Sequence, residues 1–282
     1  MQAKSVKSKF IIKQEFVFLN NIKIQYFVYG NGPSHLVTLH GFGRDYRDFF
    51  FFEELTKTYK VIGINLCYHG ESTFPIDRIS KRPITKLEWY NLFELILEKE
   101  KVDNFSLLSY SMGGKFAFCL LEKFSKKINK SVFLAPDGVI VNPWYKLVTH
   151  TKIGENLSKL FTKNTLGLPQ LIALSSYLGL TSENLKKFVE FNVSSKEKRQ
   201  KIYLVWQSFK LINPNHELIN KNLKKKSQNT LVILGKRDVA IKAAYSKFLN
   251  EQYGDLVLVK ILDLGHNLFK PETKLKVSEF LA

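Results

Sequence analysis

Short runs of apolar, mostly branched residues recur along the chain, and stretches compatible with helices separate most of them. Runs of this length without strict polar alternation are typical of strands covered on both faces of a parallel sheet. Strand–helix alternation therefore predicts an α/β fold with a mostly parallel, doubly covered β-sheet. The predicted strands are His35–Leu39, Lys60–Ile64, Asn104–Leu108, Lys130–Leu134, Thr230–Leu234 and Leu256–Leu262, and the predicted helices are Tyr46–Lys57, Lys86–Lys101, Met112–Lys127, Ile241–Gln252 and Glu272–Phe280.

Two segments depart from this alternation. Near the start, Phe16–Leu19 and Ile22–Tyr29 flank Asn20–Asn21, a pattern that predicts an antiparallel hairpin. Later, the segment Val139–Ser227 contains no convincing strand, and a structureless loop of that length would be improbable in a compact domain. We therefore expect a core of residues 1–138 and 228–282 with an inserted helical cap, or lid, at 139–227. Its helical patches are Leu171–Leu178, Thr181–Phe191 and Lys196–Leu211.

Composition excludes several classes of protein. With 45% hydrophobic residues in 282, the chain has the material for a packed interior, which rules out intrinsic disorder. Two cysteines, Cys67 and Cys119, are too few for a disulfide framework and are expected to be buried. The first residues lack a secretory signal pattern, and no apolar run is long enough to span a bilayer. We expect a cytoplasmic, soluble monomer or homodimer with no membrane span.

The formal net charge is +18, from 43 basic and 25 acidic residues. The predicted cap holds 15 basic and 5 acidic residues, so it carries +10 of that excess. The lysines are scattered, apart from the short block Lys224–Lys226, and no nucleic-acid-binding signature accompanies them. We expect no nucleic-acid partner. Compositional bias explains the charge, and steering of an anionic small-molecule substrate is the alternative.

The strongest functional signal is the segment Leu107–Gly114, which follows a predicted strand and opens a predicted helix. A side chain at so sharp a turn projects above the sheet if its second neighbours are small, as Ser109 and Gly113 are around Ser111. Such strain is typical of an exposed nucleophile. A simple helix N-cap is the alternative for Ser111.

With this context, the sequence resembles the α/β-hydrolase superfamily over nearly its whole length. The matching segments are Ser109–Gly113, Leu39–Gly43, Tyr68–Ser72, Leu234–Asp238 and Leu264–Asn267, in the order expected for that fold. Two positions depart from the family pattern, because Ser109 and Tyr68 stand where glycine is common.

The resemblance implies a catalytic triad in which Ser111 is the nucleophile, His266 the base and Asp238 the acid. It also implies that the backbone N–H groups of Phe42 and Met112 form an oxyanion hole. No metal-ligand cluster or phosphate-binding glycine loop occurs, so we expect no cofactor and no metal.

Alternatives remain for the acid. Asp238 has the position of an N-cap for the residues that follow it. Asp137 follows the preceding strand, where some family members carry the acid, although Pro136-Asp137-Gly138 is also typical of a turn. Asp263 is expected to be structural.

The substrate pocket is the least defined part. We assign His40, Tyr110, Trp144 and Trp206 to it, although His40 and His69 also resemble histidines that brace loops near the oxyanion hole. Other aromatic residues of the cap either line the pocket or pack the cap onto the core: Tyr145, Phe161, Tyr177 and Phe188.

Together these features predict a serine hydrolase, carboxylesterase-like, that cleaves a small ester, a thioester or a carbon–carbon bond through an acyl-enzyme. Two alternatives stay open. One is a lyase similar to a menaquinone-pathway branch, to whose elbow Tyr110–Gly114 is similar. The other is a non-catalytic binding protein with a hydrolase fold.

Overall fold

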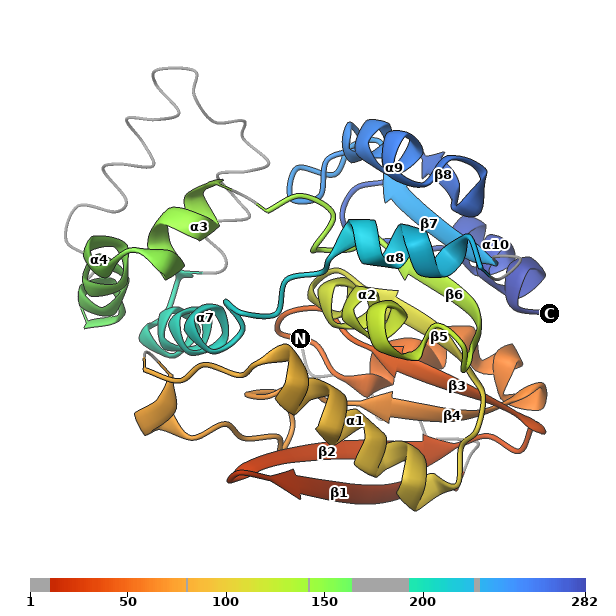
Figure 1. The fold of residues 1–282 in the computed structure, drawn as a ribbon, viewed down its shortest axis with the longest axis horizontal. Helices are drawn as coiled ribbons and strands as arrows, with labels where there is room; N and C mark the ends of the chain where they lie inside the picture. The colour runs from red at the N-terminus through yellow and green to blue at the C-terminus, as the bar shows by residue number, and fades with distance from the viewer. Residues whose placement is uncertain (1–10, 80, 142, 164–192, 226–228) are drawn as a thin grey trace.

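A computed structural model describes residues 11–79, 81–141, 143–163, 193–225 and 229–282. Within them lies one eight-stranded sheet with the strand order β1-β2-β4-β3-β5-β6-β7-β8 (Figure 1). The first two strands form the predicted antiparallel hairpin, β2 also runs antiparallel to β4, and every later pairing is parallel. The mostly parallel α/β sheet predicted from the sequence is therefore confirmed. The strands are β1 (Lys13–Leu19), β2 (Ile22–Tyr29), β3 (Ser34–Leu39), β4 (Tyr59–Ile64), β5 (Phe105–Tyr110), β6 (Ile128–Leu134), β7 (Thr230–Gly235) and β8 (Leu258–Leu262).

Helices cover both faces of the sheet. Alternate residues of the central strands point to opposite sides, so that Leu107 belongs to one apolar cluster and Leu108 to the other. Helices α1, α2, α8 (His216–Leu223) and α9 contribute to the first cluster, and η1 and α10 to the second (Figure 1). The core helices are η1 (Tyr46–Lys57), η2 (Ile76–Arg78), α1 (Lys86–Glu100), α2 (Met112–Phe124), α9 (Tyr245–Tyr253), η3 (Gly254–Leu256) and α10 (Pro271–Leu281).

Three elements differ from the sequence-based expectation. The segment 46–57 is helical at the predicted bounds but is a 3₁₀-helix, broken at Phe52 (φ −103°, ψ 42°). The helix expected from Ile241 begins only at Tyr245, because Asp238 holds the backbone of Ala240 and Ile241 in a turn. Strand β8 is an edge strand rather than a doubly covered one, with Ile261 48% exposed.

The chain between β6 and β7 forms only helices in the part that the structure describes; we call residues 139–227 the insert. Its helices are α3 (Pro143–His150), α4 (Lys152–Lys163), α7 (Lys196–Ser208) and α8 (His216–Leu223). Of these, α7 matches a predicted helical patch, and the other three were not predicted. The predicted helices Leu171–Leu178 and Thr181–Phe191 lie outside the described residues.

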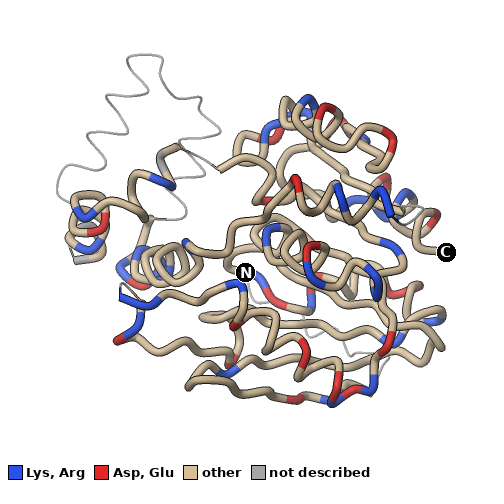
Figure 2. Tube along the Cα trace, in the orientation of Figure 1, with Lys and Arg blue, Asp and Glu red and all other residues tan. Residues whose placement is uncertain are grey.

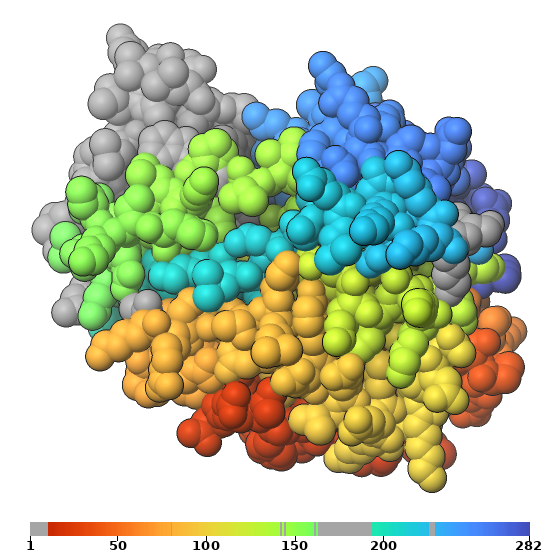
Figure 3. Space-filling model, viewed as in Figure 1, coloured from red at the N-terminus to blue at the C-terminus, as the bar shows by residue number. Residues whose placement is uncertain are grey.

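The insert contacts the core at the end of α7. The carbonyl of Ser208 accepts a hydrogen bond from the Ile84 backbone N–H at 3.0 Å, and its hydroxyl lies 3.2 Å from the hydroxyl of Tyr68. Figure 3 shows this part of the surface, where the insert, in green and cyan, meets the orange segment before α1. Lys and Arg residues occur along core and insert helices alike (Figure 2). No helix among the described residues has the length and apolarity to cross a membrane.

Candidate active site

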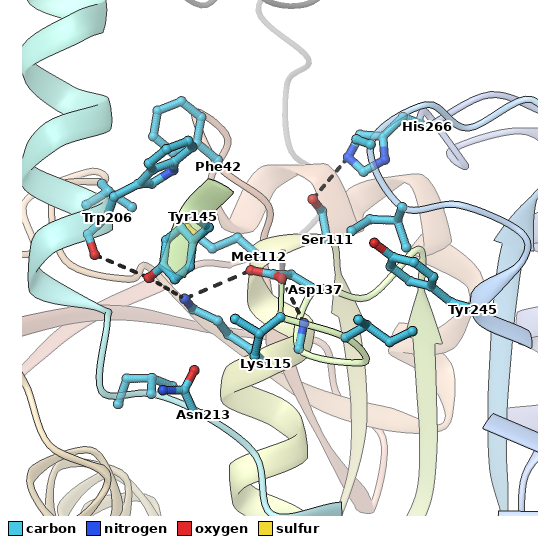
Figure 4. A pocket seen from close by; sticks show the side chains of 17 residues that line it. Phe42, Ser111, Met112, Lys115, Asp137, Tyr145, Trp206, Asn213, Tyr245 and His266 are labelled. Atoms are coloured by element: carbon cyan, nitrogen blue, oxygen red, sulfur yellow. Dashed lines mark hydrogen bonds and ion pairs between the residues drawn. The ribbon is translucent and has the colours of Figure 1, made fainter. Parts of the chain in front are cut away.

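Ser111 lies at the sharp turn between β5 and α2. Its side chain lines the cavity shown in Figure 4. Its backbone is in the sparsely populated positive-φ region (φ 49°, ψ −120°), a strained conformation for a residue with a side chain. The helix approaches β3 so closely here that a Cβ atom on Gly113 would lie 2.2 Å from the carbonyl oxygen of Leu39. The turn therefore requires a residue without a side chain at position 113 and presents the Ser111 hydroxyl above the sheet edge.

Three side chains from distant parts of the sequence form one hydrogen-bonded chain at this edge. The Ser111 Oγ atom lies 3.0 Å from His266 Nε2, and His266 Nδ1 lies 2.7 Å from Asp238 Oδ2. A carboxylate only accepts hydrogen bonds, so Nδ1 of His266 carries the proton and Nε2 accepts from the serine hydroxyl. The carboxylate of Asp238 is fully buried, while the imidazole is 24% exposed. This arrangement gives the hydroxyl a base within reach and fixes the tautomer of that base.

The carboxylate of Asp238 serves two purposes at once. Its Oδ1 atom accepts hydrogen bonds from the backbone N–H groups of Ala240 at 2.8 Å and Ile241 at 2.9 Å, while Oδ2 faces the imidazole. It therefore caps the turn after β7, as the N-cap alternative suggested, although α9 begins only at Tyr245. These bonds hold the carboxylate plane toward His266.

The other two acidic candidates face elsewhere. Asp137 accepts a hydrogen bond from the Gly138 backbone N–H at 2.8 Å, as a Pro-Asp-Gly turn requires, and lies 3.9 Å from the Lys115 ammonium. Asp263 is exposed and pairs with Arg237 at 3.3 Å. Of the three carboxylates, Asp238 is the one in contact with His266.

The loop after β3 passes directly against the serine. A Cβ atom on Gly41 would lie 2.8 Å from the Tyr110 ring and 3.2 Å from the Ser111 Cβ atom. The next residue, Phe42, lines the same cavity as Ser111 and Met112. Met112 is the first residue of α2, where backbone N–H groups have no acceptor within the helix. The two residues predicted to form an oxyanion hole, Phe42 and Met112, thus line the same cavity as Ser111.

Two buried histidines brace this loop. His69 Nε2 accepts a hydrogen bond from the Gly43 backbone N–H at 2.9 Å, and His40 Nε2 accepts one from Leu66 at 3.0 Å. Burial lowers the pKa of His40 to about 4, and burial together with the neighbouring His40 lowers the pKa of His69 to about 2. Both rings therefore stay neutral at neutral pH and act as fixed acceptors.

The cavity has a volume of about 260 Å³, the size of a small ligand, and its walls come from both the core and the insert. Trp206 and Tyr145 line it, as expected for aromatic residues of the insert. His40 and Tyr110 do not: His40 is fully buried behind the loop, and the Tyr110 hydroxyl donates to the His266 carbonyl at 3.0 Å. Their assignment to the pocket is wrong, because tight packing of the loop against β5 turns both side chains inward. Of the other aromatic residues considered for the pocket, Tyr177 and Phe188 lie outside the described residues, and for Trp144 and Phe161 only the backbone is described.

Several residues of the cavity were given no role from the sequence, and Lys115 is the charged one among them. Lys115 is buried, with its side chain 7% exposed, and reaches the cavity from α2 (Figure 4). It follows Ser111 by four residues, the spacing that puts two side chains on one face of a helix, and that spacing was the available signal. Among the described residues, no group of three His, Cys, Asp or Glu side chains is arranged to hold a metal ion.

A sequence model of the α/β-hydrolase fold matches residues 34–273, which is most of the chain. The chain belongs to the α/β-hydrolase fold family. Solved structures agree with this assignment at the level of the fold. An α/β-hydrolase enzyme, MGS-M2, from a Medee basin deep-sea metagenome library has a TM-score of 0.67 at 17% identity, covering 94% of this chain and 96% of its own. An esterase from Exiguobacterium antarcticum has a TM-score of 0.62 at 17% identity, covering 95% and 97%.

Among curated proteins, a partial match is found to a putative 2-succinyl-6-hydroxy-2,4-cyclohexadiene-1-carboxylate synthase from Bacillus subtilis (strain 168). It is 29% identical over 112 residues, which are 39% of this chain and 40% of the relative. The match thus spans well under half the length of that relative.

Proposed function

We propose that this α/β-hydrolase-fold protein is a serine hydrolase that cleaves a small ester, a thioester or a carbon–carbon bond through an acyl-enzyme. The observation that carries the proposal is the continuous hydrogen-bonded chain from Ser111 through His266 to Asp238, with contacts of 3.0 and 2.7 Å. A serine hydroxyl is a weak nucleophile at neutral pH, and this chain supplies the base that activates it.

In the proposed mechanism, Ser111 attacks the substrate carbonyl while His266 Nε2 takes the hydroxyl proton. The buried carboxylate of Asp238 stabilises the imidazolium that forms. The developing oxyanion is bound by the backbone N–H groups of Phe42 and Met112. The imidazolium then returns its proton to the leaving group, and His266 activates water to hydrolyse the acyl-enzyme.

The insert would act as the cap that closes the substrate pocket. Tyr145 and Trp206, from α3 and α7, line the cavity opposite the strand ends that carry Ser111 and His266. In this arrangement the core supplies the reacting groups and the insert sets which substrates fit.

The partial similarity to the Bacillus subtilis synthase favours a second candidate. In that case His266 and Ser111 would serve as the base of a lyase reaction on a carboxylated cyclic precursor, without an acyl-enzyme. The two candidates share the triad and differ in whether Ser111 becomes covalently modified.

Pre-steady-state kinetics with 4-nitrophenyl esters of graded acyl length test the hydrolase. We expect a stoichiometric burst of 4-nitrophenolate followed by turnover, and a loss of about 10⁴- to 10⁶-fold in kcat/KM for Ser111→Ala. Circular dichroism of the variant controls for folding. Turnover that survives in Ser111→Ala would contradict the proposal, and a missing burst with activity on the cyclic precursor would favour the lyase.

A further inference from the structure

A buried ammonium group with no hydrogen bond of ordinary length lies in the cavity beside the nucleophile. The Lys115 Nζ atom is 3.4 Å from the Tyr145 hydroxyl, 3.4 Å from the Phe209 carbonyl and 3.9 Å from the Asp137 carboxylate. Charge-assisted hydrogen bonds to an ammonium are normally 2.7–2.9 Å long. These three partners therefore surround the ammonium, but none of them makes a hydrogen bond of ordinary length to it.

The group stays charged in this setting. Burial acts to lower the pKa of Lys115, but the facing oxygens of Tyr145 and Asp137 raise it overall above the ordinary value. The Asp137 side chain is 43% exposed and its other oxygen is held by the Gly138 backbone N–H, so it neutralises the ammonium only in part. Tyr145 donates its proton to the Trp206 carbonyl at 3.2 Å, which leaves its oxygen facing the ammonium. A cation thus remains available inside a largely apolar cavity.

Helix α2 fixes the position of Lys115 relative to Ser111. Ser111 caps the helix and Lys115 follows one turn later, a rise of about 6 Å along the axis. Figure 4 shows both side chains at the same cavity, with His266 above Ser111 and with Tyr145 and Asp137 beside Lys115. A Cβ atom on Gly138 would lie 2.7 Å from that of Lys115, so the loop after β6 packs directly on the base of the lysine and leaves its end to reach the cavity.

We propose that Lys115 is an anion subsite that selects substrates carrying a carboxylate a few bonds from the scissile carbonyl. The carboxylate would approach Nζ at hydrogen-bond distance, between Tyr145 and Asp137, while the carbonyl lies at Ser111. This inference rests on the proposed function for its reaction, but the binding of the anion does not require hydrolysis.

Matched pairs of esters test the subsite, with the carboxylate on either side of the scissile bond. One pair is mono-4-nitrophenyl adipate and 4-nitrophenyl hexanoate, and the other is 4-acetoxybenzoate and 4-acetoxybenzamide. The wild type should prefer the charged member of at least one pair. In Lys115→Met that preference should fall about 10- to 100-fold, the value of one charge-assisted hydrogen bond. Lys123→Met, an exposed lysine on the same helix, should keep the wild-type preference.

Asp137→Asn sharpens the test in the opposite direction. Removing the carboxylate 3.9 Å from Nζ leaves the ammonium less neutralised, so the preference for the charged ester should rise several-fold. A purely structural role for Lys115 would change both members of a pair by the same factor, which would overturn the proposal.

Calorimetric titration with adipate and with 4-hydroxybenzoate separates this inference from the proposed reaction. If the wild type hydrolyses neither ester of a pair, the hydrolase proposal fails, yet one of the two anions should still bind the wild type and bind Lys115→Met at least 10-fold more weakly. No binding to the wild type, or equal binding to both proteins, would overturn the subsite.

Discussion

Two differently built parts of the molecule form the cavity. One is the rim of the sheet, meaning the carboxyl ends of its parallel strands with the loops that follow them, and the other is the insert. At the rim, Ser111, Asp238 and His266 follow β5, β7 and β8, whose parallel pairing brings the strand ends together. In the insert, α3 and α4 pack mainly on each other and on α7, and apolar side chains such as Leu157 and Leu160 are 61% exposed. The sheet therefore sets the positions of Ser111, Asp238 and His266, whereas the insert contributes cavity walls from helices with more exposed apolar side chains.

The largest expected effect is on kcat, and it should distinguish Asp238 from Asp137. Asp238→Asn removes the acceptor that fixes the His266 tautomer, so kcat should fall about 10⁴-fold. Asp137→Asn keeps the hydrogen-bonded chain intact, and kcat for a neutral ester should change less than about 10-fold. Steady-state kinetics with 4-nitrophenyl butyrate measure both. The reverse order of effects would transfer the acid role to Asp137.

Adding one methyl group at Gly41, in the loop after β3, should have the next largest effect on kcat. In Gly41→Ala the new Cβ atom would meet the Tyr110 ring at 2.8 Å, and the loop must move away together with the Phe42 N–H group. We expect kcat to fall about 10²- to 10³-fold, as for the loss of one oxyanion donor.

Gly265→Ala is the matched control, because its Cβ atom would have no neighbour within 4 Å although it also lies beside the site. It should cost much less activity than Gly41→Ala. Equal losses in the two variants would argue against an oxyanion-binding role for this loop.

Substitutions of cavity residues in the insert should change KM more than kcat. Trp206 lines the cavity but is 38% exposed, so Trp206→Ala should raise KM for esters of medium chain length by about 10-fold or less, with kcat nearly retained. Leu160→Ala, on the exposed face of α4, should leave both constants near the wild-type values. A collapse of kcat in Trp206→Ala would show that the insert takes part in the chemistry.

Acidic pH should lower the unfolding free energy of the protein, because His40 and His69 are buried in their neutral forms. Their pKa values are lowered in the folded protein, to about 4 for His40 and about 2 for His69, whereas an unfolded histidine titrates near 6.5. Between these pKa values the unfolded chain therefore binds more protons than the folded chain. The stabilisation from each neutral ring is complete above pH 6.5 and is lost as the pH falls. Between pH 7 and 5 we expect each ring to contribute a loss of about 2 kcal/mol in unfolding free energy.

Urea unfolding at pH 7 and pH 5 measures this loss. His69→Gln should show a smaller difference between the two pH values than the wild type. His150→Gln, at an exposed position on α3 where the pKa is lowered less, should reduce that difference less. An unchanged difference in His69→Gln would contradict the bracing role.

The rim was more predictable than the insert for physical reasons. Short local patterns, such as Gly113 two residues after Ser111, are required by backbone geometry and so are visible in the sequence. The side on which His40 and Tyr110 point, the exposure of β8 and the burial of Lys115 depend on packing between distant segments, which no local pattern encodes. Most strand and helix bounds of the core were predicted to within a few residues, whereas three short helices of the insert, α3, α4 and α8, were missed.

If Ser111 is an activated nucleophile, it should react covalently with an active-site label. The protein is treated with a fluorophosphonate and the modified peptide is mapped by mass spectrometry. We predict one covalent adduct on Ser111, absent in Ser111→Ala and strongly slowed in His266→Gln. A folded wild-type protein that remains unlabelled, or that is labelled at another residue, would contradict the central claim.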